Sequence, residues 1–222
     1  AQISMTNEYP TPQFPMGYWI IVILFVIGTW TLFILPYASA DDTKVSVIQS
    51  TYQSIQDLQA NFVQSTHVAV LGTTISEPGV FSMKKPGMMR IEYTGEHPKQ
   101  YISNGKKLWI VSKELDQVET YKVDKGAIPK EALEFLNGFA DMEKFFIVNG
   151  WKPKNRRAAS AYLRLVPKNG KAQYNWLDCE FGPDNLLKTM AIHNKSGNVS
   201  TYVFNNAKVN QGLEDDLFNF KP

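Results

Sequence analysis

The chain has 222 residues, which is enough for one sizeable domain and a targeting segment. Its 23 basic and 21 acidic side chains give a formal net charge of +2, so the charge balance does not call for a nucleic-acid partner. With 44% hydrophobic residues the composition is ordinary for a globular protein, and the single cysteine, Cys179, excludes an intramolecular disulfide.

The N-terminal segment carries an export signal. Residues 18–35 form an almost unbroken apolar run, YWIIVILFVIGTWTLFIL, and the small residues Ala38-Ser39-Ala40 then resemble a signal-peptidase site after Ala40. The run is longer than the ~7–15 residues usual for a signal peptide and long enough to span a bilayer as a helix. Residues 1–40 are therefore a cleaved signal peptide or a retained inner-membrane anchor. Under both interpretations the domain at residues 41–222 lies outside the cytoplasm.

The exported domain is predicted to begin with an amphipathic helix from about Asp42 to Leu58. Asp41, Asp42 or Thr43 can cap its start, where acidic residues suit the helix dipole. We expect its apolar face to pack on a sheet. The residues spaced three or four apart on that face are Val45, Ile48, Tyr52, Ile55 and Leu58.

Strand patterns dominate the rest of the domain. Short alternating segments are separated by turns rich in Gly, Pro and Asn, so neighbouring strands are expected to be antiparallel. The first group comprises Ala60–Val70, Thr74–Met83, Met88–Thr94, Lys99–Ser103, Lys106–Ser112 and Gln117–Val123. The second group comprises Phe145–Asn149, Ala161–Pro167, Tyr174–Phe181, Leu187–Asn194 and Val199–Phe204.

Between the two groups of strands, the pattern changes to a helical one. The segment AIPKEALEFLNG, from Ala127 to Gly138, predicts a short and strongly apolar helix, with Pro129 in its first turn and Gly138 at its end. A second short helix is expected at about Asp141–Lys144. The chain is thus predicted to be mainly β, of the α+β class, with about eleven strands and three helices in one exported domain.

The most informative stretch runs from Gly79 to Val111. A Lys-Lys-Pro-Gly turn and the Asn104-Gly105 hairpin signal divide it into an antiparallel meander. Its second strand alternates Met89, Ile91 and Tyr93 with charged residues, which indicates one apolar face. Such a sheet could curl and enclose an apolar lumen, or the same side chains could fill an ordinary core.

No catalytic or metal-binding pattern accompanies this meander. The three histidines, His67, His97 and His193, lie far apart without the spacing of a metal site, and Cys179 has no catalytic signature around it. The largest basic cluster, at residues 152–157, favours a solvated loop over a phosphate-binding patch. The sequence therefore predicts a binding protein and not an enzyme.

Several motifs follow one another along the exported domain. They are the amphipathic first helix, Leu58-Gln59-Ala60-Asn61-Phe62-Val63-Gln64, Gly79-x-Phe81-x-Met83-Lys84-Lys85-Pro86-Gly87-Met88-Met89-Arg90-Ile91-Glu92-Tyr93, Ser103-Asn104-Gly105-Lys106-Lys107-Leu108-Trp109-Ile110, the helix from Ile128, and the final Phe218-Asn219-Phe220-Lys221-Pro222. In the order and spacing of these motifs the chain resembles the periplasmic outer-membrane lipoprotein carrier family, LolA.

The resemblance implies a strongly curved antiparallel sheet that forms an incomplete barrel, covered by a helical lid over a hydrophobic cavity. Such proteins accept acylated lipoproteins from an inner-membrane ABC transporter and pass them to an outer-membrane receptor. No cofactor is implied, and we expect a monomer. The expected lipid-binding residues are Phe62, Phe81, Met83, Met89, Ile91, Tyr93 and Trp109 from the sheet, with Leu133 and Leu136 from the lid.

Lys85 departs from the family pattern. Family members often have an Arg before the turn proline, where it holds the lid shut, whereas Lys85 lacks the planar bidentate fork of Arg. We expect Lys85 to serve as the lid latch. The alternatives to a free periplasmic carrier are a membrane-tethered module of related fold that senses lipids or lipoproteins, and an exported enzyme with a hidden site.

Overall fold

The computed structural model describes residues 40–112, 114–123, 139, 142–155, 157, 160–168, 170 and 172–221. The apolar run at residues 18–35 and the predicted lid helix at residues 127–138, with Leu133 and Leu136, lie outside the described residues. All described residues belong to one structural unit that begins at Ala40. Within them, no helix has the length and apolar character needed to cross a bilayer.

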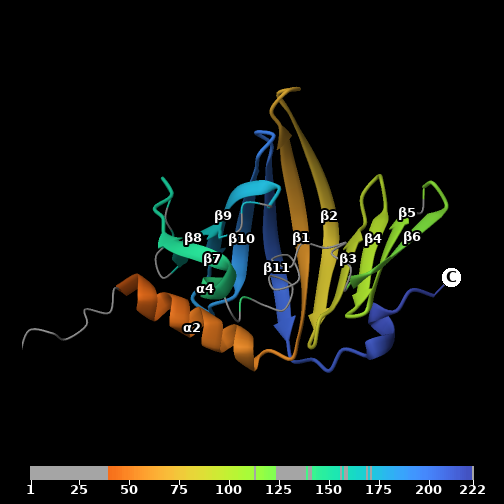
Figure 1. Cartoon of the computed structure of the whole chain (residues 1–222), viewed down its shortest axis with the longest axis horizontal. Helices are drawn as coiled ribbons and strands as arrows, with labels where there is room; N and C mark the ends of the chain where they lie inside the picture. The colour runs from red at the N-terminus through yellow and green to blue at the C-terminus, as the bar shows by residue number, and fades with distance from the viewer. Residues whose placement is uncertain are drawn as a thin grey trace, which may run out of the picture. The chain divides into compact units, whose positions relative to one another are not determined.

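Eleven strands form one sheet in the order β6-β5-β4-β3-β2-β1-β11-β10-β9-β8-β7 (Figure 1). Every neighbouring pair is antiparallel, and β6 and β7 are the two edges of this open sheet. The predicted open antiparallel architecture is thus confirmed. The strands on one side are β1 Asp57–Val68, β2 Thr73–Lys84, β3 Met88–Tyr93, β4 Lys99–Asn104, β5 Lys107–Ser112 and β6 Gln117–Lys122. The others are β7 Phe146–Gly150, β8 Ala161–Pro167, β9 Tyr174–Phe181, β10 Leu187–Asn194 and β11 Val199–Val209.

The first helix, α2, spans Ala40–Ser54 and is shorter than predicted. Its predicted end at Leu58 was wrong, because β1 begins at Asp57 and Leu58 pairs there with Met83 and Val209. Leu58 fits the spacing of a helix face as well as it fits a strand. It lies in a strand because β1 pairs on both sides, with β2 and with β11. The second short helix, α4, spans Met142–Phe145, within one residue of the prediction.

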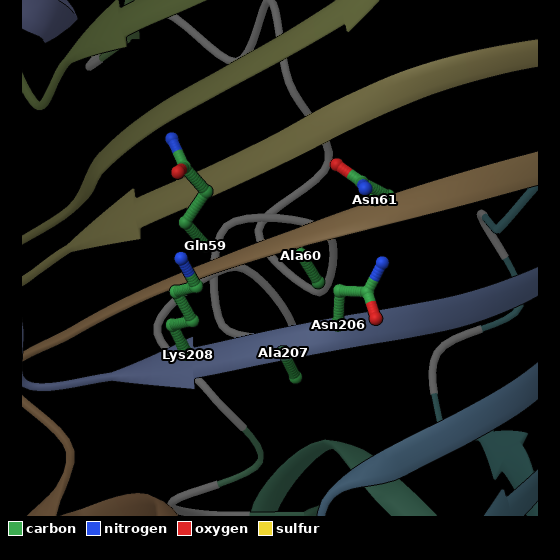
Figure 2. A pocket seen from close by; sticks show the side chains of 6 residues that line it. All are labelled: Gln59, Ala60, Asn61, Asn206, Ala207 and Lys208. Atoms are coloured by element: carbon green, nitrogen blue, oxygen red, sulfur yellow. The ribbon is translucent and has the colours of Figure 1, made fainter.

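Strand β11 continues five residues beyond its predicted end at Phe204. The pairing of β1 with β11 shifts register between Gln59 and Asn61, and Asn206 adopts a left-handed conformation with φ 52° at this bulge. Figure 2 shows the bulge, with Gln59 and Lys208 on one side of the strands and the methyl groups of Ala60 and Ala207 on the other. Because Asn tolerates positive φ, the strand can resume beyond the bulge.

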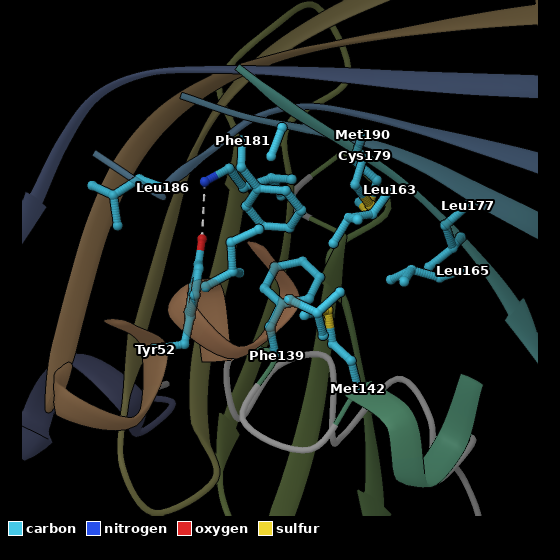
Figure 3. Packing of buried hydrophobic residues seen from close by; sticks show 14 of the residues in the cluster. Tyr52, Phe139, Met142, Leu163, Leu165, Leu177, Cys179, Phe181, Leu186 and Met190 are labelled. Atoms are coloured by element: carbon cyan, nitrogen blue, oxygen red, sulfur yellow. Dashed lines mark hydrogen bonds between the residues drawn. The ribbon is translucent and has the colours of Figure 1, made fainter. Parts of the chain in front are cut away.

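The hydrophobic core lies on one face of the sheet, which we call the inner face. Helix α2 contributes Val45, Ile48 and Tyr52, each at most 5% exposed. The Tyr52 ring makes edge contacts with Phe139, 4.9 Å between centroids, and with Phe181, and its hydroxyl accepts a hydrogen bond of 3.0 Å from the Leu187 amide (Figure 3). Burial raises the pKa of the Tyr52 hydroxyl, which therefore stays neutral. The helix is thus held by packing and by one buried polar contact.

The C-terminal segment covers part of the opposite, outer face. The short helix η2, Asp215–Phe218, packs against β3 and β4, and Phe218 is fully buried. Arg90 donates a hydrogen bond to the Leu217 carbonyl, and the buried Asp57 carboxylate accepts from two amides just after β11. This end of the sheet is therefore covered on both faces.

Replacement of Ile48 by alanine tests the docking of α2. Ile48 is 0% exposed, so Ile48→Ala should lower the free energy of unfolding by about 2–5 kcal/mol. Val47 lies on the same helix and is 45% exposed, so Val47→Ala should change the free energy of unfolding by less than about 0.5 kcal/mol. Denaturant unfolding measures both, and equal effects would contradict this packing.

Candidate functional site

The inner face of β1 to β3 carries a continuous apolar surface. Phe62 pairs with Gly79, and Gly79 pairs in turn with Tyr93, so the three positions form one row across the sheet. A Cβ atom on Gly79 would lie 2.4 Å from the Phe62 ring, so only glycine lets this ring lie across β2. The Phe62 ring then makes an edge contact with Tyr93, 5.3 Å between centroids.

The sheet register places six of the seven lipid-binding residues predicted in the sheet on this face, and Trp109 is the exception. Phe81 pairs with Ile91, and Met83 pairs with Met89, and these pairs lie two and four residues along from the row of Phe62. All of them therefore share the inner face. Met83 and Met89 are buried at 3% and 4% exposure, whereas Phe81 and Ile91 are half-buried.

Trp109 was wrongly placed on this face by the sequence pattern. It pairs with Ile102, which pairs with Arg90, so its side chain belongs to the outer face. Strand β5 instead presents Leu108 and Ile110 to the inner face. The run Leu-Trp-Ile-Val is apolar at every position, so alternation alone could not decide which side chains point inward.

Sequence reasoning also missed inner-face residues outside the meander. Tyr202 and Phe204 of β11 stack at 6.3 Å and 14°, and both lie within 6.3 Å of the Phe62 ring centroid. Their alternation with Thr201 and Val203 was the available signal, but it did not show that β11 lies next to β1. Leu133 and Leu136 lie outside the described residues, so their predicted place in the lid stays a prediction.

The inner face changes from apolar to polar along β1. The end of this face near Leu58 and Met83 is apolar. Further along β1, the Gln64 side chain accepts a hydrogen bond from the Tyr93 hydroxyl and donates one to Thr66. The Lys99 ammonium lies 4.6 Å from the Tyr93 ring centroid. Burial raises the pKa of Tyr93, so its hydroxyl remains a neutral donor. The face therefore suits a ligand with an apolar body and a polar end.

Lys85 lies in the turn between β2 and β3 and contacts the end of α2. Its ammonium donates hydrogen bonds of 2.6 Å to the Tyr52 carbonyl and 3.0 Å to the Gln53 carbonyl. Carbonyls at a helix C-terminus lack intrahelical partners and attract cations. Partial burial lowers the pKa of the Lys85 ammonium. Lys85 thus ties the meander to α2, while its predicted contact with the lid at residues 127–138 is untested.

A shallow pocket of about 420 Å³ lies at the β1–β11 bulge (Figure 2). Its polar lining comes from Gln59, Asn61, Asn206 and Lys208, and it includes no predicted site residue. Within the described ranges, no group of three or more His, Cys, Asp or Glu side chains is arranged to hold a metal ion. Cys179 is fully buried, and burial raises the pKa of its thiol.

The fold and this face define a class: open antiparallel-sheet proteins with a helix on an extended apolar inner face. Residues 53–221 match the family described as outer membrane lipoprotein carrier protein LolA. Because this match spans most of the chain, the chain belongs to the LolA family, and the predicted family is confirmed. The members of this family are carriers of lipoproteins.

Curated relatives agree with this assignment. The chain is 22% identical over 190 residues to an outer-membrane lipoprotein carrier protein of Nitrosospira multiformis, covering 86% of this chain and 90% of the relative. It is 27% identical over 186 residues to that of Methylococcus capsulatus, covering 83% and 86%. A LolA superfamily protein from Nitrosomonas europaea aligns with 13% identity and a TM-score of 0.43, covering 79% of this chain and 97% of that one.

Removal of the Lys85 ammonium should loosen the end of α2. The loss of a cation at a helix C-terminus costs about 0.3–1 kcal/mol, so Lys85→Ala should speed amide hydrogen exchange in the last turn about two- to fivefold. Lys84→Ala is the matched control, because the Lys84 ammonium donates to Leu213 and Asp215 in the C-terminal segment. Unchanged exchange in α2 with Lys85→Ala would contradict the contact.

Proposed function

We propose that this protein is a periplasmic carrier that holds the acyl chains of lipoproteins against the inner face of β1 to β5. It accepts them from an inner-membrane ABC transporter and passes them to an outer-membrane receptor. The observation that carries the proposal is the shared inner face of Phe62, Phe81, Met89 and Ile91, which turns polar towards Gln64. Membership of the LolA family supports it.

The energetics of acyl chains require such a surface. Burial of hydrocarbon stabilises by about 0.8 kcal/mol per CH₂, so one long chain in water costs on the order of 10 kcal/mol. A carrier must cover this surface and still release it. Met83 and Met89 suit that task, because unbranched thioether side chains adapt to ligands of varied shape.

Release requires that the cover of the inner face can open. We assign Lys85 to this step as the latch, because one side chain in the β2–β3 turn reaches two carbonyls of α2. A Lys makes these contacts as a point charge on a flexible stem, without the planar fork of Arg. The latch is therefore held by few bonds, which favours opening. Leu133 and Leu136 complete the cavity in this proposal as part of the lid.

A polar side chain on the inner face should weaken binding of acyl chains. Ile91→Asn is expected to bind a fluorescent triacylated lipopeptide at least about tenfold more weakly, because burial of an isoleucine contributes about 1.5–3 kcal/mol. Val118 is the matched control, since it is apolar but 44% exposed on the outer face of β6. Fluorescence anisotropy gives both affinities, and Val118→Asn should match the parent protein.

Two outcomes would contradict the carrier. The first is equal lipopeptide affinity for Ile91→Asn and the parent protein. The second is a periplasmic preparation whose mass spectrum contains no acylated cargo, together with no transfer of lipoprotein from inner-membrane vesicles.

The apolar run at residues 18–35 favours a second candidate, a membrane-tethered module that senses lipids or lipoproteins. A free carrier requires cleavage after Ala40, so N-terminal sequencing of the exported protein should begin at Asp41. A retained segment in the membrane fraction would contradict the shuttle and favour the tethered module.

A further inference from the structure

The outer face of β8 to β10 carries a second cluster of functional groups, away from the inner face. Tyr162 pairs with Glu180, and Asp178 pairs with both Arg164 and Ala191, so these side chains share one face. Leu163 and Cys179, which alternate with them, belong to the core. The cluster is therefore separated from the acyl-chain surface by the sheet itself.

A pocket of about 320 Å³ opens on this face beside the segment that follows β7. Trp151 and Tyr162 form its aromatic wall, with ring centroids 5.9 Å apart and planes at 87°. Thr189 and Ala191 line it from β10, and the carboxylates of Asp178 and Glu180 also border it. Two carboxylates beside aromatic rings favour cations, and the protein's own Arg164 guanidinium already lies 5.8 Å from the Trp151 ring centroid.

Asp178 is already neutralised within the protein. Its carboxylate accepts hydrogen bonds of 2.6 and 2.8 Å from Arg164, and a third of 3.2 Å from the Trp176 indole. His193 lies 3.1 Å from the same carboxylate and stacks on Trp176. With the side chain of Asp178 only 6% exposed, these partners satisfy it and hold the pocket wall rigid.

Glu180 borders the pocket, and its contacts within the described residues fall on one of its two carboxylate oxygens. Ser160, the Tyr162 hydroxyl and Arg157 all reach the same oxygen, Oε1, at 3.2 to 3.6 Å. An ionised carboxylate has about four acceptor positions on its two oxygens. The side chain of Arg157 is 73% exposed, so its ion pair offsets little of the charge of Glu180. Glu180 is therefore the group on which a ligand cation would rest.

The loop beside this pocket is basic. Trp151, Pro153 and Asn155 line the pocket, and Lys152 and Lys154, which alternate with them along the chain, are exposed to solvent. Arg157 follows at the edge beside Glu180. The sequence pattern favoured a solvated loop here, which agrees with the exposure of both lysines, and the fold places this loop beside a pocket bordered by carboxylates and aromatic rings. A ligand that fits both the pocket and the loop has a cationic end for the pocket and an anionic end for the loop.

We propose that this pocket binds a phosphorylated amino alcohol of the phosphoethanolamine type. Its ammonium rests against Glu180 beside Trp151 and Tyr162, and its phosphate faces Lys152, Lys154 and Arg157. The chemistry is shared by soluble phosphoethanolamine and by the headgroup of phosphatidylethanolamine. Because the site lies on the outer face, its ligand binding can be tested independently of acyl-chain binding on the inner face.

Titration of the parent protein with phosphoethanolamine tests the ligand. Saturable shifts are expected in the NMR signals of the Trp151 and Trp176 indoles and of the His193 ring. Glycerol 3-phosphate has a similar size and phosphate but no ammonium, and it should bind at least about tenfold more weakly. Equal affinity for both compounds, or shifts that do not saturate, would overturn the proposal without recourse to any variant.

Substitution then assigns the residues. Glu180→Gln keeps the shape of the side chain and should weaken phosphoethanolamine about tenfold, whereas Glu96→Gln, at an exposed turn, should have no effect. The paired change Lys152→Ala and Lys154→Ala should weaken phosphoethanolamine but not ethanolamine, with Lys106→Ala as the control. Unchanged affinity in Glu180→Gln, with an unchanged fold by circular dichroism, would overturn the site.

Vesicles identify the source of the ligand. Co-sedimentation with vesicles of phosphatidylethanolamine and phosphatidylcholine, but not with phosphatidylcholine alone, would support a lipid headgroup. Binding of soluble phosphoethanolamine without binding to either vesicle would support a soluble ligand of the same chemistry. Binding of lysine-rich peptides in place of phosphoethanolamine would overturn the proposal and indicate a protein-docking pocket.

Discussion

The antiparallel pairing of β1 with both of its neighbours is the constraint on which the rest of the domain depends. β1 pairs with β2 from Asp57 to Val68 and with β11 from Leu58 to His67, so it joins the two halves of the sheet. Because side chains alternate with a period of two, this register decides the face of each residue in every strand paired outward from β1. The apolar inner face and the polar pocket of the outer face are both consequences of it.

The start of β1 is also the point where distant parts of the chain meet. The Asp57 carboxylate accepts hydrogen bonds from the Gln211 and Gly212 amides, which bring the C-terminal segment onto the outer face. The Lys85 ammonium reaches the end of α2 on the inner side. Asp57 thus holds the C-terminal segment on the outer face, and Lys85 holds the end of α2 on the inner face. This separation lets one sheet present a hydrocarbon surface and, on its other side, a pocket with fixed charges.

Much of the architecture could be predicted from local patterns. The bounds of β8, β9 and β10 agree with the predicted ones, because alternation and the turn residues around Gly182 and Ser196-Gly197 are local signals. The errors occurred where two structures fit one pattern. Leu58 suited a helix face as well as a strand, and β11 passed its predicted end because a bulge at Asn206 let it continue. Among the site residues, Trp109 was assigned to the wrong face, because the run from Leu108 to Val111 is apolar at every position.

Residue order and turn residues were enough to predict about eleven strands, the antiparallel meander from Gly79 to Val111 and the family, because these features depend on neighbours along the chain. Tertiary contacts were needed to show which face Trp109 occupies, which helix Lys85 contacts, and that Trp151 lies beside Tyr162 and Glu180. Each of these three features depends on contacts between distant segments. The alternation of side chains along a strand is the same whichever set faces inward. The register of pairing outward from β1 determines which set that is.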